Sequence, residues 1–231
     1  MTLQHSRPLG ILCLERGGTP SKSRPGSILH PTTFSFPVIS DIVEGAWADV
    51  VIRGDPPLES AYVAAARRLV EQGAVAISSN CGFSMRYQSS VAAAVNVPVA
   101  LSSLLLLPTL LRQLPVRRKL VILTADSSCC DEALLGIEDP AQRARVVIGG
   151  IEGGKLWQNE MVRPPPYTET SEIEADVVAC LGRLQVAHEG VAAILCECTG
   201  FPPVASAIRR ITRLPVYDVT DLCRMTMASV A

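Results

Sequence analysis

The sequence is poor in aromatic side chains and has no excess of either charge. Phe, Trp and Tyr make up 4% of the 231 residues, and 21 Lys and Arg are balanced by 22 Asp and Glu. Few aromatic rings leave few platforms for stacking single-stranded bases. A net charge of −1 does not concentrate a phosphate backbone or an anionic membrane. We therefore expect neither nucleic acid nor a membrane as a partner.

Long apolar runs and an export signal are also missing. The longest apolar stretch, residues 101–111, contains Ser102, Ser103 and Pro108 and is too short to cross a bilayer. Residues 1–8 lack the basic and then apolar pattern of a signal peptide. We therefore expect a cytoplasmic protein whose eight cysteines are free thiols rather than a disulfide framework.

Motifs for metals and common cofactors are incomplete. Cys196 and Cys198 have no second cysteine pair or histidine cluster to complete a zinc site. Residues 149–155 match the start of a phosphate-binding loop, but Leu156 stands where Ser or Thr would hold magnesium. No GxGxxG motif follows a predicted strand. The sequence therefore predicts neither a metal nor an organic cofactor.

Short apolar runs alternate with helical patterns, which is typical of a parallel α/β protein. With 48% hydrophobic residues the chain has enough apolar surface for a large core. The predicted strands are residues 10–14, 47–52, 74–78, 97–100, 119–124, 146–148, 192–196 and 216–218. Ser171 and Glu174 predict a capping box at the start of a helix that continues through Leu184.

The most informative pattern is an internal repeat with a constant offset of 117 residues, the spacing from Cys81 to Cys198. Four landmarks, Gly73, Ile77, Cys81 and Pro98, recur in order as Gly190, Ile194, Cys198 and Pro215. We therefore predict two similar Rossmann-like lobes, with parallel sheets related by a pseudo-twofold axis and an active site in the cleft. The first lobe comprises residues 1–100 and the C-terminal segment 214–231, and the second comprises residues 101–213.

Cys81 and Cys198 occupy equivalent places, each after a predicted strand and before a predicted helix. Ligands of parallel sheets bind beyond the carboxyl ends of the strands, and amides at a helix N-terminus hold carboxylates and lower the pKa of a thiol. Two thiols on opposite faces of a ligand suit stereochemical inversion, because one removes the α-proton and the other supplies a proton. We predict that this pair is catalytic. Donors for the developing charge flank it: Asn80, Thr199 and the amides around Gly82 and Gly200.

Residues 198–202 (CTGFP) resemble the C-T-x-x-P signature of the second half-site in the aspartate/glutamate/hydantoin racemase superfamily. Residues 79–83 (SNCGF) take the place of the first cysteine loop of that family, and Thr124 resembles a threonine that lies beside the substrate. The resemblance spans almost the whole chain. It implies cofactor-independent racemisation or epimerisation of an amino acid, a hydantoin or a related small carboxylate, without pyridoxal phosphate or metal.

Two positions depart from the pattern of glutamate racemases. Gly200 stands where those enzymes have a histidine, and Gly82 and Phe83 replace an Asn-Thr pair after the first cysteine. Phe83, together with Phe201, indicates a substrate that is less polar than glutamate.

Two other functions fit the same residues. One is a maleate-type cis–trans isomerase, in which one cysteine forms a covalent adduct. The other is a non-catalytic protein that binds a small carboxylate. The carboxylates of Glu15, Asp126 and Glu197 lie at predicted strand ends, where each either assists the thiols or is solvated or salt-bridged. A homodimer is the default expectation for the oligomeric state.

Overall fold

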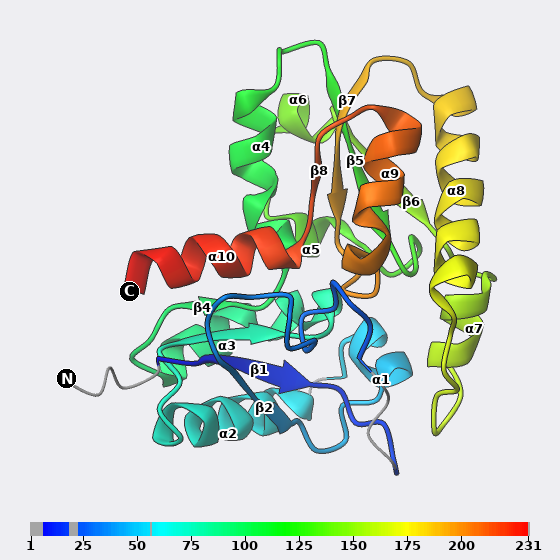
Figure 1. Cartoon of the computed structure of the whole chain (residues 1–231). Helices are drawn as coiled ribbons and strands as arrows, with labels where there is room; N and C mark the ends of the chain where they lie inside the picture. Colours follow the sequence, from blue (N-terminus) through cyan, green and yellow to red (C-terminus); the bar gives the residue numbers. More distant parts are fainter. Residues whose placement is uncertain (1–6, 19–22, 56, 231) are drawn as a thin grey trace.

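The computed structural model describes residues 7–18, 23–55 and 57–230. It contains two four-stranded parallel sheets with the strand orders β2-β1-β3-β4 and β6-β5-β7-β8. The first sheet consists of β1 (Leu9–Cys13), β2 (Val38–Ile42), β3 (Ala76–Ser79) and β4 (Val99–Ala100). The second consists of β5 (Lys119–Thr124), β6 (Val146–Gly150), β7 (Val191–Cys196) and β8 (Val216–Tyr217). Each sheet forms the centre of one lobe (Figure 1). The predicted α/β fold with two lobes is confirmed.

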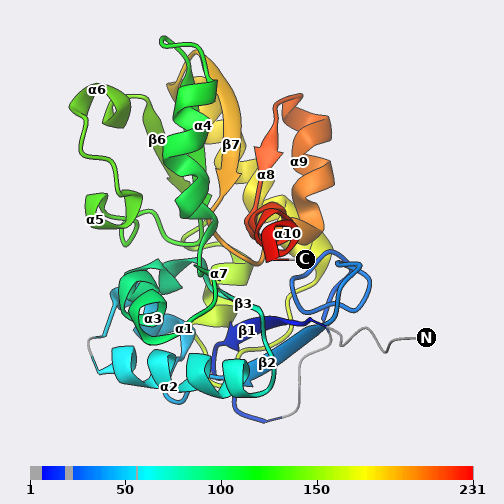
Figure 2. The same ribbon diagram turned by 90° about the vertical axis from the view of Figure 1, so that its left-hand side faces the viewer.

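Helices cover the sheets in each lobe (Figures 1 and 2). The first lobe has α1 (Ala48–Arg53), α2 (Leu58–Glu71), the 3-10 helix η1 (Gly82–Tyr87) and α3 (Gln88–Ala94). The second has η2 (Ser103–Leu106), α4 (Leu107–Gln113), α5 (Glu132–Leu135), α6 (Pro140–Arg143), α7 (Lys155–Glu160), α8 (Thr170–Ala187), η3 (Pro202–Val204) and α9 (Ala205–Thr212). Within the described residues, no helix is both long and apolar enough to span a bilayer.

The internal repeat of the sequence corresponds to equivalent strand pairing in the two sheets. Ile77 pairs with Val99 in the first sheet, and Ile194 pairs with Val216, 117 residues later, in the second. The amide of Ile77 donates to the carbonyl of Pro98 at 2.9 Å, and Ile194 makes the same bond to Pro215 at 2.9 Å. The two lobes therefore place their cysteine loops at equivalent ends of equivalent strands.

The C-terminal segment divides between the lobes. β8 lies at the edge of the second sheet, and only α10 (Val219–Val230) crosses back to the first lobe (Figure 2). There Val219, Cys223 and Met227 pack in one apolar cluster with Leu9 and Ile11 of β1. The segment 214–231 was predicted to belong to the first lobe, but the crossing occurs after Tyr217, because residues 214–217 complete the second repeat.

The strand predicted at residues 47–52 is wrong. Residues 48–53 form α1, which ends at Gly54 in the left-handed conformation (φ 75°), where its amide donates to Val50 and Val51. The β-branched run favoured a strand, yet Val51 and Ile52 are buried on one face of the helix. The missing strand is β2, whose half-exposed edge position leaves no continuous apolar run in the sequence.

The capping box of α8 lies two residues before its predicted position. Glu169 is the N-cap, and its side chain and that of Glu172 bond reciprocally to backbone amides. The sequence TETSEIE offers several acidic and hydroxyl pairs at the same spacing, so the pattern alone does not single out one of them.

Candidate active site

The cleft between the lobes contains a cavity of about 150 Å³. Its walls come from the carboxyl ends of four strands: Leu14 follows β1, residues 80–83 follow β3, Ala125 follows β5 and residues 197–200 follow β7. Residues from the segment 23–29, from α7 and from the segment 165–167 complete the enclosure. The cavity is therefore where parallel sheets of this kind bind ligands.

Cys81 and Cys198 both line this cavity, one from each lobe. Each lies two residues after the last residue of its strand, Ser79 of β3 or Cys196 of β7. The amides of Phe83 and Ser84 lower the pKa of the Cys81 thiol. The thiol of Cys198 accepts a hydrogen bond from the amide of Gly200, at 3.4 Å. Loop amides therefore stabilise negative charge on either sulfur.

Burial opposes this stabilisation. It raises the pKa of Cys81 to about 12 and that of Cys198 well above its usual value, and the charge of Glu197 raises the pKa of both further. Both thiols are therefore protonated at neutral pH. For either one to act as a base, the substrate complex must lower its pKa.

The side-chain nitrogen of Asn80 has no partner among the described residues. Its Oδ1 accepts a hydrogen bond from the amide of Leu14 at 2.8 Å, and its backbone carbonyl accepts one from the hydroxyl of Thr199. Since the side-chain oxygen is engaged, the amide nitrogen is the group that remains to bind a ligand. The bond from Thr199 also joins the two cysteine loops across the cleft.

The structure brings most of the predicted site residues together. Seven of them line the cavity: Asn80, Cys81, Gly82, Phe83, Cys198, Thr199 and Gly200. Thr124 does not, because it is fully buried behind the cavity wall and donates its hydroxyl proton to Glu197 Oε2 at 2.7 Å.

Glu197 is buried, and it forms no salt bridge with any residue that the structure describes. Its exposed fraction is 0%, and it lies in the wall of the cavity. Oε2 accepts a hydrogen bond from the hydroxyl of Thr124, whereas Oε1 has no partner among the described residues. Burial raises the pKa of this carboxyl group to about 7. Glu197 therefore changes its charge close to neutral pH.

The other two carboxylates at strand ends have structural contacts. Glu15 accepts a hydrogen bond from the amide of Gly45 at 2.8 Å. Asp126 accepts one from the indole of Trp157 at 3.1 Å and so fixes the position of that ring in the cavity wall.

Sequence reasoning missed the residues that close the cavity from outside. Arg16 forms an ion pair with Glu160 across the cleft at 2.9 Å, and Arg24 bonds to the carbonyl of Thr168 and lies over the ring of Tyr167. In each of these pairs the partners lie more than 140 residues apart in the chain, so no local motif marks them. Across the ranges that the structure describes, no three His, Cys, Asp or Glu side chains are grouped as metal ligands.

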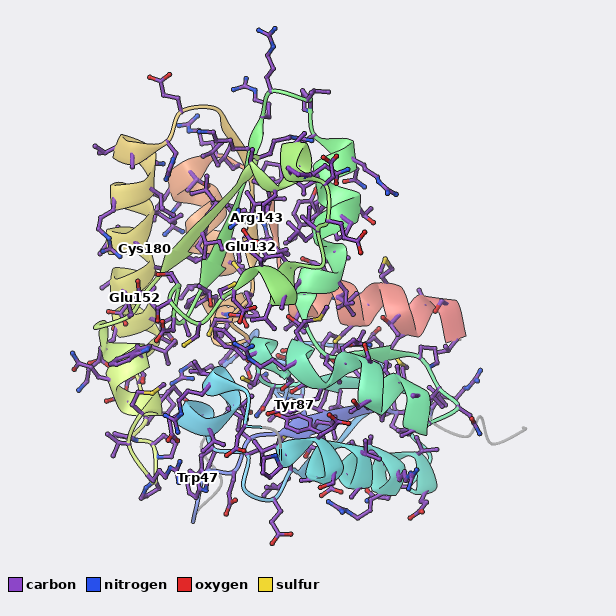
Figure 3. The ribbon with its side chains drawn as sticks, turned by 180° about the vertical axis from the view of Figure 1, so that it is seen from behind. Trp47, Tyr87, Glu132, Arg143, Glu152 and Cys180 are labelled. Atoms are coloured by element: carbon purple, nitrogen blue, oxygen red, sulfur yellow. The ribbon has the colours of Figure 1, made fainter. Side chains whose placement is uncertain are left out.

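A chain of buried hydroxyl groups supports the Cys81 loop from below. Ser84 Oγ is hydrogen-bonded to both Tyr62 and Ser79 at 2.9 Å, and Ser79 Oγ accepts from the amide of Cys81 at 3.2 Å. The Tyr62 ring stacks on Tyr87, whose side chain is labelled in Figure 3, with 4.3 Å between centroids.

Replacing Tyr62 by Phe should lower the free energy of unfolding by about 1–2 kcal/mol, because Ser84 loses a buried partner. Urea unfolding would measure this change. Tyr87→Phe is the matched control and should cost less, since among the described residues the hydroxyl of Tyr87 bonds only the carbonyl of Asp55, in a partly buried position. An equal or larger loss in Tyr87→Phe would contradict this account of the hydroxyl chain.

Comparison with curated proteins finds similarity to a group of lyases, although no family model matches the chain. Dimethylsulfoniopropionate lyase 3 of Emiliania huxleyi is 28% identical over 96% of this chain and 59% of its own length. Dimethylsulfoniopropionate lyase of Durusdinium sp. clade D is 29% identical over 84% of this chain and 66% of its own length. This chain thus spans about three fifths of the length of the Emiliania huxleyi protein.

Comparison with solved structures finds racemases and a decarboxylase. The aspartate racemase of Picrophilus torridus has a TM-score of 0.58 at 12% identity, and covers 92% of this chain and 89% of its own. The glutamate racemase of Francisella tularensis in complex with D-glutamate has a TM-score of 0.54 at 16% identity, covering 93% and 77%. Unliganded arylmalonate decarboxylase has a TM-score of 0.51 at 18% identity, covering 97% and 92%. At these identities the likeness concerns the fold.

Proposed function

We propose that this chain, which has the two-lobed fold of the aspartate/glutamate/hydantoin racemase superfamily, is a lyase that cleaves a sulfonio-carboxylate such as dimethylsulfoniopropionate. The observation that carries the proposal is the pair of thiols, one from each lobe, that line a single cavity. A thiolate there can reach the α-carbon of a bound carboxylate. The curated relatives named as lyases of this compound indicate the reaction that follows.

The reaction requires one base. The thiolate removes a proton from the α-carbon, the electron pair of that C–H bond forms the Cα=Cβ double bond, and the bond from Cβ to sulfur breaks. The products are acrylate and neutral dimethyl sulfide, and the proton remains on the thiol. Donors that stabilise charge on the substrate carboxylate lower the barrier to the first step.

The walls of the cavity suit both ends of this substrate. Phe83, Trp157 and Met161 provide apolar and aromatic surface next to the carboxylate of Glu160, and methylated cations bind well in such surroundings. On the same cavity, the side-chain nitrogen of Asn80 provides a hydrogen-bond donor for a carboxylate.

Racemisation or epimerisation is the second candidate. It is favoured by the equivalent positions of Cys81 and Cys198 in the two repeats, since inversion uses an acid and a base on opposite faces of one carbon. Both candidate reactions begin with the removal of an α-proton. In the lyase the electron pair expels dimethyl sulfide, whereas in the racemase the carbanion takes a proton on its opposite face.

The deciding experiment incubates the purified chain in heavy water with dimethylsulfoniopropionate, with chelator present and no pyridoxal phosphate. We expect dimethyl sulfide in the headspace and acrylate in the proton NMR spectrum, in equal amounts. The double variant Cys81→Ser/Cys198→Ser should form neither product. Cys129→Ser removes a thiol that does not line the cavity and should retain activity.

Parallel incubations with amino acids, hydantoins and hydroxy acids test the second candidate. Incorporation of deuterium at an α-carbon with inversion, and without release of dimethyl sulfide, would replace the lyase by a racemase. The absence of both reactions would exclude both candidates for this chain.

A further inference from the structure

The repeat pairs Glu197 with Asn80. Each is the residue before a cavity cysteine, and the two are 117 residues apart. The amide of Asn80 donates to the carbonyl of Leu12 at 3.0 Å, and the amide of Glu197 donates to Leu123 at 2.8 Å. The first bond joins the end of β3 to β1, and the second joins the end of β7 to β5. The two backbones therefore follow the same path.

Both side chains are also fixed through one oxygen. Asn80 Oδ1 accepts a hydrogen bond from the amide of Leu14, two residues after Leu12. Glu197 Oε2 accepts one from the hydroxyl of Thr124, the residue after Leu123. In both lobes one side-chain oxygen is thus fixed by a residue at the end of the neighbouring strand. The other terminal atom of the Asn80 side chain is an amide nitrogen, which is a hydrogen-bond donor.

The second atom of Glu197 is Oε1, which has no partner among the described residues although the side chain is fully buried. A carboxylate oxygen in this position would be charged and unsatisfied, which is costly in a buried site. A protonated Oε1 would match the donor that Asn80 presents from the other lobe. Oε2 already accepts a hydrogen bond from Thr124, as the carbonyl oxygen of a neutral carboxylic acid can.

The charged and titratable groups around Glu197 do not compensate a negative charge. The negative charge of Glu197 raises the pKa of four nearby thiols, so the charged carboxylate and these groups interact unfavourably. The four thiols are those of Cys81, Cys130, Cys196 and Cys198. Arg86 is the cation that favours the charged form, and its effect is smaller than that of burial. The surroundings therefore favour the neutral acid.

We propose that protonated Glu197 binds the substrate carboxylate, with Oε1–H as a hydrogen-bond donor that complements the Asn80 amide from the opposite lobe. When the α-proton leaves, negative charge moves onto the carboxylate oxygens, and donors from the two lobes stabilise it. Ionised Glu197 would repel the substrate and keep both thiols protonated. The proposal deepens the proposed function, because it assigns the group that recognises the substrate carboxylate.

The test measures binding of propionate, a carboxylate probe that needs no turnover, to the full chain by NMR titration. From about pH 6 to pH 9 propionate stays ionised, so changes in affinity report on the protein. For the wild type we expect the affinity to fall about tenfold per pH unit above pH 7, because ionisation of Glu197 removes the donor. Glu197→Gln keeps a donor that does not ionise, so its affinity should stay within about threefold of the wild-type value at pH 6 throughout.

Glu152→Gln is the matched control, because it removes a carboxylate that bonds Ser127 outside the cavity (Figure 3); it should keep the wild-type pH dependence. Thr124→Val is a second variant that removes a hydrogen bond to the charged form. It should raise the pKa of Glu197 and shift the loss of affinity to higher pH. If Glu197→Gln does not fold, the pH dependence of propionate binding to Thr124→Val tests the proposal instead.

The proposal is overturned if wild-type affinity is constant or rises between pH 6 and pH 9, or if Glu197→Gln keeps the wild-type slope or binds tenfold more weakly at pH 6. A midpoint that does not move in Thr124→Val would also overturn it. Since propionate binding needs no chemistry, these results are independent of whether dimethyl sulfide is released. A chain that shows the expected pH dependence but no lyase activity would retain the Glu197 proposal and lose the proposed reaction.

Discussion

Replacing one of the two cavity cysteines, Cys81 or Cys198, by serine should reduce the kcat/KM for release of dimethyl sulfide by about 10²–10⁴, whereas the same change at the other should reduce it by no more than about tenfold. Elimination needs one base, and the neutral sulfide leaves without a proton. A serine hydroxyl is too weak a base to replace a thiolate.

Headspace gas chromatography over a series of substrate concentrations gives the two values of kcat/KM. Cys129→Ser serves as the control for a nonspecific effect of losing a thiol, because Cys129 lies outside the cavity. Equal losses in Cys81→Ser and Cys198→Ser would contradict the assignment of a single base.

The same two variants distinguish the racemase candidate. In a two-base racemase each thiol serves one face of the α-carbon, so both variants would lose net inversion. Each surviving thiol would still exchange the proton that faces it. The variants would then incorporate deuterium into opposite enantiomers, which proton NMR with a chiral shift reagent can resolve.

The repeat made the fold predictable. Local apolar runs gave seven of the eight strands approximately, and the constant offset of 117 residues related the two sheets to one another. The pattern of apolar residues misassigned two segments, because their burial in the fold does not follow their composition. β2 is an edge strand with alternating exposure, and α1 contains a β-branched run that is buried against its own lobe.

The site residues that could be predicted from the sequence are those that belong to the internal repeat. Cys81 and Cys198 were marked by equivalent positions, and their neighbours in the chain came with them to the cavity wall. Arg16, Trp157 and Glu160 belong to no repeated motif, and their place in the wall depends on how the two lobes face each other.

The environment of Glu197 depends on both lobes. Its backbone belongs to the second lobe, and Gly82 of the first lobe lies against its carbonyl and its carboxyl group. The sequence of the second lobe alone predicts a carboxylate at the end of a strand, and such a carboxylate is exposed to solvent in many proteins. Burial by the opposite loop is what raises the pKa of the Glu197 side chain.

Gly82→Ala should lower kcat/KM by about 10²-fold or more and the free energy of unfolding by about 1–3 kcal/mol. A Cβ at residue 82 would lie 2.1 Å from the carbonyl oxygen of Glu197 and 2.2 Å from its Oε1, both of which are impossible contacts. The carbonyl is backbone at the end of β7, where the amide of Glu197 is fixed to Leu123 at 2.8 Å, so it has little freedom to move. The Cys81 loop must shift instead, and this displaces the thiol relative to Cys198.

Gly200→Ala is the matched control in the other cysteine loop. Its Cβ would lie 3.1 Å from Leu156 Cδ2, the end of a flexible side chain, and 3.5 Å from Cys198 Sγ. That neighbour can move by a few tenths of an ångström, so we expect a loss of activity below tenfold and little change in urea unfolding. If the two glycine variants behaved alike, the close approach of the two loops at Gly82 would not exist in solution. If only Gly82→Ala failed, the contact between Gly82 and Glu197 would be what holds the two thiols at one cavity.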